Sequence, residues 1–120
     1  MSRWAPFVDE IANELITWPG VQIERRSDGA AVARYEHSEL GVLYEQRGVV
    51  ELPFFGLEHD ELIERGEAEP AEMTPESVGV SHEVHGPEDV TEVLELFDRR
   101  YRELRGADKP NSSEDPDYRD

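Results

Sequence analysis

The sequence predicts an α+β domain of two layers, in which an antiparallel sheet of about five strands carries helices on one face. Three observations predict this class. Apolar residues recur at helical spacing in three segments, they alternate with a period of two in several others, and short turns join the first four strand segments. The expected order of elements is α-β-β-β-β-α-β-α.

The first helix and four strands are expected in the first half of the chain. One apolar stripe with steps of three and four residues predicts a helix over residues 5–17. The stripe consists of Trp4, Phe7, Val8, Ile11, Leu15 and Trp18. Pro19 and Gly20 end this helix, and the alternating pattern follows between residues 21 and 55. Short turns between these strands indicate an antiparallel meander.

The second half begins with a helix between Gly56 and Gly66, because acidic residues fill its first turn and a glycine follows its last. A loop is expected over residues 67–75, where prolines interrupt any pattern. A fifth strand is expected over residues 77–85, since apolar residues alternate there again.

The third helix has the strongest sequence signals. Pro87 suits the first helical position, two acidic residues follow it, and arginines fill the last turns before Gly106. One domain is therefore expected over residues 1–106. Residues 107–120 lack an apolar pattern and are expected to form a disordered acidic tail.

The charge of the chain excludes several classes of partner. Its 120 residues include 29 Asp and Glu against 12 Lys and Arg, a formal net charge of −17. Residues 45–98 hold most of this charge, with 16 acids and 2 bases. Such a charge repels phosphate backbones and anionic headgroups, so neither nucleic acid nor membrane is expected as a partner. No apolar run is long enough to span a membrane, and the chain has no cysteine. For these two reasons, a cytoplasmic location is expected.

The basic residues show a second bias, because eleven of the twelve are arginine and Lys109 is the only lysine. Acid excess combined with scarce lysine predicts a halophilic protein. The physical reason is screening, since the Debye length falls to about 3 Å at 1 M salt and self-repulsion is then largely cancelled. An ordinary acidic protein is the alternative.

Five short motifs follow one another along the chain. They are Trp18-Pro19-Gly20-Val21, Glu39-Leu40-Gly41-Val42-Leu43, Leu52-Pro53-Phe54, the run from Glu61 to Pro70, and the run from Gly86 through Phe97 to Tyr101. Together they resemble the luciferase-like domain family, a small family named after a domain shared with fungal luciferase. The resemblance covers residues 7–104, and the layout is more distantly similar to the MmcQ/YjbR-like fold.

The chain departs from that family at the positions best suited to chemistry. Members often carry histidines where this chain has Val42, Tyr44, Ala71 and Glu72. The resemblance therefore implies a fold, but it transfers no site residue and implies no light emission.

His82 and Tyr44 are the candidate catalytic residues. Alternation places His82 on the apolar face of the fifth strand, where burial or a neighbouring carboxylate would shift its pKa. A hydrogen-bonded core histidine is the alternative. Tyr44, with Tyr35 and Tyr101, is expected between the sheet and the helices, either donating hydroxyls to a small ligand or filling the core.

No metal site and no cofactor are expected. His82 and His85 stand three residues apart and would point to opposite faces of a strand, unless the strand has ended by Val84. The carboxylates of residues 58–64 lie at helical spacing, but a solvated helix face is expected in so acidic a chain. His59, within that run, is expected at the surface.

These observations favour a non-catalytic module that binds a small ligand or a protein. One alternative is an enzyme that acts on a small apolar substrate through a pocket near Tyr44 and His82. Another is a subunit of a larger assembly, anchored by Phe54-Phe55 or Trp4. The sequence leaves the ligand, the partner and the oligomeric state undefined.

Overall fold

A computed structural model describes residues 5–73 and 79–108 of the chain. Three helices and six strands occur in these ranges. In chain order they are α1 (Ala5–Leu15), β1 (Val21–Arg25), β2 (Ala31–Tyr35), β3 (Ser38–Tyr44), β4 (Val49–Leu52), α2 (Gly56–Glu64), β5 (Glu69–Pro70), β6 (Val80–Glu83) and α3 (Pro87–Asp108).

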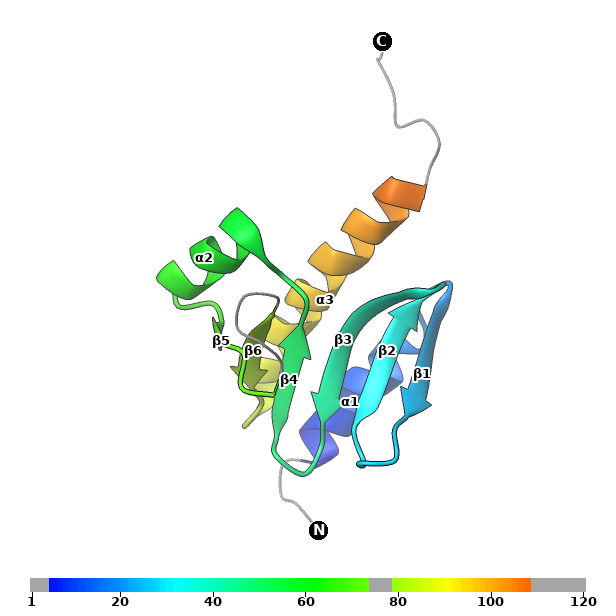
Figure 1. Ribbon diagram of the computed structural model, residues 1–120. Coiled ribbons are helices and arrows are strands. Elements are labelled where there is room, and N and C mark those ends of the chain that lie inside the picture. The colour runs from blue at the N-terminus through cyan, green and yellow to red at the C-terminus, as the bar shows by residue number, and fades with distance from the viewer. Residues whose placement is uncertain (1–4, 74–78, 109–120) are drawn as a thin grey trace.

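The six strands form one sheet in the order β1-β2-β3-β4-β6-β5, and every neighbouring pair is antiparallel. Helices α1 and α3 lie behind the sheet in Figure 1, whereas α2 lies beside its β4–β6–β5 end. The predicted α+β class, with helices on one face of an antiparallel sheet, is confirmed.

The core fills the space between the sheet and the two covering helices. Most elements contribute alternate or helically spaced buried side chains, as the patterns predict, whereas both residues of β5 are exposed. The buried side chains include Val8, Ile11 and Leu15 of α1, Leu43 and Val50 of the sheet, and Val93 and Phe97 of α3. Burial of this kind contributes about 1.5–3 kcal/mol for each large side chain and fixes α3 on the sheet.

Several elements differ from the expectation, and the strand expected to reach residue 85 ends at Glu83. The segment expected as a loop contains the two-residue strand β5, paired with β6 at Glu69↔Ser81 and Pro70↔Val80. Two residues carry no periodicity, and proline suits an edge strand because it has no N–H to pair. Helix α1 ends at Leu15, and α3 continues to Asp108, past the expected end of the domain. The predicted tail from residue 109 on lies outside the described residues, as do Trp4 and the start of the expected fifth strand.

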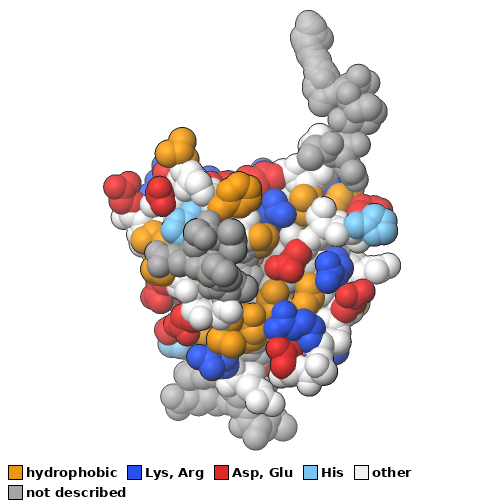
Figure 2. All heavy atoms as spheres, viewed as in Figure 1, with side chains coloured by type: hydrophobic (Ala, Val, Ile, Leu, Met, Phe, Trp, Pro, Cys, Tyr) orange, Lys and Arg blue, Asp and Glu red, His pale blue; other side chains and the backbone are white. Residues whose placement is uncertain are grey.

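The other face of the sheet carries a second, smaller apolar cluster. It consists of Ala30, Val32, Val42 and Tyr44. Figure 2 shows apolar side chains on this face lying between arginines and carboxylates. The buried carboxylate of Glu51 lies here and accepts the backbone N–H groups of Glu72 and Met73 at 2.8 and 2.7 Å, which attaches that segment to the sheet. Neighbouring side chains thus bury the cluster without a covering helix.

Among the described residues, no helix is both long enough and apolar enough to cross a membrane.

Candidate functional site

His82 lies on β6 and pairs with Val50 of β4, so its ring faces the helices rather than the open face. Its side chain is 13% exposed. The ring atom Nδ1 lies 2.7 Å from the carbonyl oxygen of Glu83, and Nε2 lies 3.1 Å from Oε1 of Glu92 on α3. Both ring nitrogens therefore have oxygen partners.

The carbonyl partner fixes the tautomer of this ring. A carbonyl oxygen only accepts, so Nδ1 must carry the hydrogen that it donates to Glu83. A neutral ring then presents the lone pair of Nε2 to the carboxylate of Glu92. In that arrangement the two facing atoms are both acceptors, so a hydrogen atom or a cation must lie between them.

The first turns of α3 supply the acidic partners. The helix begins at Pro87, and the carbonyl oxygen of Gly86 accepts the N–H groups of Asp89 and Val90 at 3.1 and 3.2 Å. Acidic residues are favourable here because a helix N-terminus carries partial positive charge. Asp89 and Glu92 are three residues apart and share one helix face. Candidate ligand atoms of His82, Asp89 and Glu92 lie within 4.8 Å of one another.

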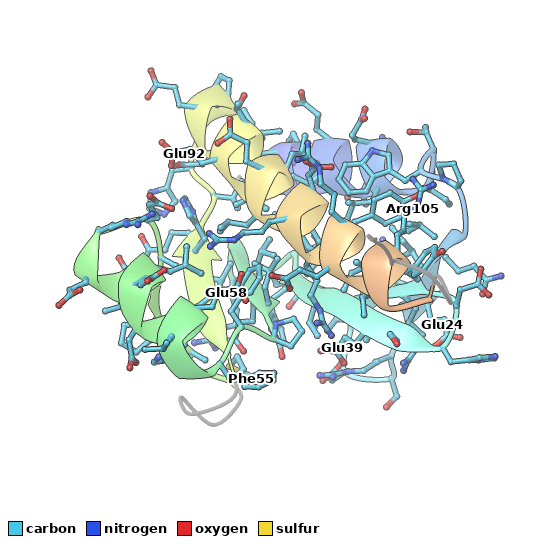
Figure 3. The ribbon with its side chains drawn as sticks, turned by 90° about the horizontal axis from the view of Figure 1, so that it is seen from above. Glu24, Glu39, Phe55, Glu58, Glu92 and Arg105 are labelled. Atoms are coloured by element: carbon cyan, nitrogen blue, oxygen red, sulfur yellow. The ribbon has the colours of Figure 1, made fainter. Side chains whose placement is uncertain are left out.

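These residues border a pocket of about 230 Å³ between the end of α2, strands β5 and β6, and α3, here called the corner pocket. Its lining includes Glu67, Glu69, Glu83, Asp89, Glu92, His82 and His85. No lysine or arginine is among the described residues that line it. Figure 3 shows Glu92 near the start of α3, on the side toward α2. The residues that line the pocket thus include five acids and two histidines.

His85 lines the same pocket as His82 because it lies beyond the end of the strand, where alternation between the two faces no longer applies. Strand β6 ends at Glu83, so His85 belongs to the connection to α3. Its Nε2 lies 3.3 Å from Oε1 of Glu83, and its backbone N–H donates to Oδ2 of Asp89 at 2.8 Å. The second contact holds the Asp89 carboxylate in place.

Tyr44, the other predicted candidate, lies on the opposite face of the sheet. The pairs Tyr44↔Val49 and Val49↔Glu83 place it on the face of Glu83, whereas His82 points to the helix-covered face. Burial raises the pKa of the Tyr44 hydroxyl above its ordinary value. Tyr44 lines a separate hollow of about 240 Å³. The structure therefore does not bring the two residues into one pocket.

The remaining aromatic candidates fill the core. Tyr101 packs against Trp18 at 5.0 Å between ring centroids and against Tyr35 at 5.3 Å. The Tyr101 hydroxyl donates to the carbonyl oxygen of Pro19 at 2.7 Å, which satisfies it without a ligand. Of the predicted hydrophobic anchors, Phe54 is 1% exposed and belongs to the core, whereas Phe55 is 63% exposed.

His59 is not at the surface, and that expectation is wrong. The residue is 8% exposed on the inner side of α2, where its Nδ1 lies 2.9 Å from Oδ1 of Asp60. Its Nε2 is buried without a hydrogen-bond partner. The pocket lining does not include it, so His59 lies outside the candidate site.

Of the acidic residues on α2, Glu58 contacts α3. Oε2 of Glu58 lies 2.9 Å from Nε of Arg99. Glu103 is also hydrogen-bonded to Glu58, and burial together with this carboxylate raises the pKa of Glu103 to about 7. In Figure 3, Glu58 lies between the two helices.

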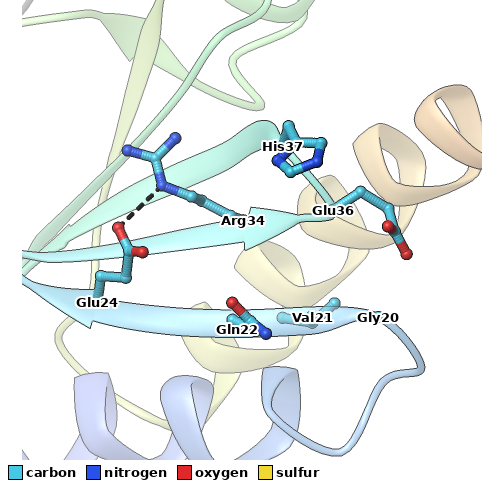
Figure 4. Close-up of a pocket in the computed structure, with 7 residues that line it drawn as sticks. All are labelled: Gly20, Val21, Gln22, Glu24, Arg34, Glu36 and His37. Atoms are coloured by element: carbon cyan, nitrogen blue, oxygen red, sulfur yellow. Dashed lines mark hydrogen bonds and ion pairs between the residues drawn. The ribbon is translucent and has the colours of Figure 1, made fainter.

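A hollow of about 680 Å³ lies along β1 and β2. Figure 4 shows its residues spread along the strands, with Glu24 and Arg34 pointing toward one another. Nε of Arg34 lies 3.1 Å from Oε1 of Glu24, so the central charges compensate each other. This hollow is an open strand surface without a buried, directed polar group, and we do not assign it a ligand.

Sequence reasoning singled out His82 but missed Asp89 and Glu92 as its partners. A usable signal exists in the sequence. A histidine on the apolar face of a strand, a connection of three residues, and two acids at helical spacing in the next helix place the three side chains together.

No protein-family model, no curated protein and no solved structure matches this chain. The resemblance to the luciferase-like domain family stays a prediction from the sequence motifs.

Proposed function

We propose that this chain is a binding module for a small cationic ligand, which it holds in the corner pocket. One observation carries the proposal: five acidic residues and a largely buried histidine are among the residues that line a single pocket, and no described lining residue is basic. A pocket lined by one sign of charge concentrates ions of the opposite sign.

The size of the pocket narrows the class of ligand. A volume of about 230 Å³ is below the range of roughly 300–1,000 Å³ that is typical for drug-sized ligands. A hydrated metal ion or a short organic amine fits this space, whereas a larger apolar substrate does not. The acidic lining of the pocket, rather than its size, favours a cation over the small apolar substrate of the alternative.

A thermal-shift screen tests the proposal with putrescine, spermidine, Mg²⁺ and Zn²⁺, all at one fixed KCl concentration. A ligand that binds only the folded chain raises its melting temperature. At 100 times its dissociation constant the stabilisation is about 2.7 kcal/mol, or on the order of 10 °C for a domain of this size.

A matched pair of double variants locates the binding. Glu67→Gln with Glu69→Gln removes two carboxylates from the pocket lining, so the thermal shift should shrink. Glu10→Gln with Glu61→Gln removes the same charge from exposed positions elsewhere, and it should leave the shift unchanged. Equal shifts in both double variants, or no shift with any cation, would contradict the proposal.

A further inference from the structure

We infer that the cation in the corner pocket is a divalent transition-metal ion, bound by Nε2 of His82 and by the carboxylates of Asp89 and Glu92. The inference rests on the proposed function and names its ligand class.

The first argument is the orientation of the His82 ring. Its Nδ1–H donates to the carbonyl oxygen of Glu83, which leaves Nε2 directed at the carboxylate of Glu92 across 3.1 Å. Metal-binding histidines use this arrangement, because a backbone carbonyl that accepts from one nitrogen orients the other toward the metal. The hydrogen bond to Glu83 therefore already holds the His82 ring in the orientation that a metal ligand needs.

The second argument is the spacing of the ligand atoms. They lie within 4.8 Å of one another, whereas bonds of about 2.1 Å in a tetrahedral site need separations of about 3.4 Å. Nε2 of His82 and Oε1 of Glu92 are already 3.1 Å apart, so only the separations from the Asp89 carboxylate would have to shorten. Asp89 is held by the N–H of His85 through Oδ2, which leaves Oδ1 for the metal.

The third argument is the chemistry of the donor set. One imidazole nitrogen with two carboxylates suits Zn²⁺ and its first-row neighbours, whereas Mg²⁺ and Ca²⁺ prefer oxygen ligands alone. Three protein ligands leave at least one coordination position for water. The solvent-exposed side of the pocket, where Glu92 lies, is where that water would bind.

The placement of the ligands predicts a structural effect of binding. His82 comes from β6, whereas Asp89 and Glu92 come from the first turns of α3. An ion bound to all three connects the sheet directly to the helix. Binding should therefore raise the melting temperature, and the rise should level off once one ion is bound per chain.

Calorimetric titration of metal-free, untagged protein with ZnCl₂ tests the inference, together with metal analysis after dialysis. The wild type should bind one Zn²⁺ per chain. Glu92→Gln and His82→Ala should each weaken binding at least about tenfold, since even partners of metal ligands contribute about 10- to 100-fold. Glu92→Gln changes an exposed side chain and decides the matter if His82→Ala does not fold.

Glu88→Gln is the matched control, because it removes one charge from the exposed start of the same helix without touching the proposed ligands. It should bind Zn²⁺ with wild-type affinity. Equal weakening in Glu88→Gln and Glu92→Gln would overturn the metal site, as would unchanged binding in both Glu92→Gln and His82→Ala. Binding of an organic amine without Zn²⁺ would overturn the metal inference alone, whereas binding of no cation would overturn the proposed function as well.

Discussion

At Gly41, β3 and α3 lie closer together than a side chain would permit. A Cβ atom built there would come within 2.7 Å of Cε1 of Phe97 and 2.8 Å of the carbonyl oxygen of Glu51. The fully buried ring of Phe97 therefore packs directly on the backbone of the sheet. Because Asp89 lies about two turns earlier on α3, this contact helps to set the height of the acidic turns over the sheet.

We expect Gly41→Ala to destabilise the fold by about 1–3 kcal/mol, because overpacking forces the ring or the strand to move. Urea denaturation measures the change. Gly106→Ala is the control, since a Cβ atom there meets nothing within 4 Å and alanine is the better helix former. A variant at Gly41 as stable as the wild type would show that Phe97 does not require the close approach.

At the scale of elements, α2 is attached to α3 by a small charged cluster. Arg99 pairs with Glu58, and its guanidinium carbon lies 5.9 Å from the ring centroid of Phe54. Glu103 shares a hydrogen bond with Glu58, and the pair holds a proton because burial and the neighbouring carboxylate raise the pKa of Glu103. Attachment of α2 is thus sensitive to pH near neutrality.

This cluster predicts that stability falls as the pH rises. The pKa of Glu103 is about 7 in the folded chain and 4.5 ordinarily, so the folded state retains a proton that the unfolded state releases between these values. The contribution of Glu103 is fully present below pH 4.5 and is lost as the pH rises through 7. Glu103→Gln should keep the hydrogen bond, remove this pH dependence and be more stable than the wild type at pH 8.

Urea denaturation at pH 5 and pH 8 measures the free energy of unfolding of Glu103→Gln and of the wild type. The difference between the two proteins at each pH removes the contribution of the groups that they share. Glu95→Gln removes one exposed charge from the same helix and controls for general repulsion. If Glu95→Gln and Glu103→Gln change the pH dependence equally, the proton shared with Glu58 is not its cause.

The elements themselves were predictable wherever a pattern extends over a full strand or helix. The stripe that includes Leu15 and the alternation through Val80 predicted the correct element types, because the same apolar side chains that form the pattern form the core. Strand β5 has only two residues and exists through pairing with β6, so no local signal marks it. The expectation for His59 was wrong because α2 packs at the end of the sheet. Tertiary contacts there decide which side of the helix is buried, and His59 lies on that side.

The candidate site was predictable only in part. Strand alternation located His82 on the covered face, but its partners depend on how sharply the chain turns between Glu83 and Pro87. Tyr44 was grouped with His82 because the sequence does not show which face of a neighbouring strand is covered. Register decides that question, and it separates the two residues.

At the scale of the whole molecule, the acidic segment and the corner pocket coincide. Residues 45–98, which hold 16 acids and 2 bases, include every residue that lines the pocket. General repulsion in this segment weakens the fold at low salt, whereas a bound cation neutralises it locally. The halophilic prediction therefore concerns the dependence of stability on KCl, whereas the proposed binding site concerns stabilisation by a bound cation at fixed KCl.

We expect the melting temperature to rise steeply with KCl, because a net charge of −17 repels itself least when it is screened. Thermal denaturation followed by circular dichroism between low salt and about 2 M KCl measures this effect. The upper end of this range screens the charges strongly, because the Debye length is already about 3 Å at 1 M salt. An unchanged melting temperature would contradict the halophilic prediction, and it would leave the corner pocket to be judged by its own tests.

In the proposed site, a metal ion lies between Nε2 of His82 and the carboxylate of Glu92. Two-bond proton–nitrogen correlation spectra of the histidine rings, recorded with and without one equivalent of Zn²⁺, test this placement most directly. We expect Nδ1 of His82 to keep its hydrogen and the Nε2 resonance to move when Zn²⁺ binds. Unmoved His82 resonances in the presence of bound Zn²⁺ would contradict this placement.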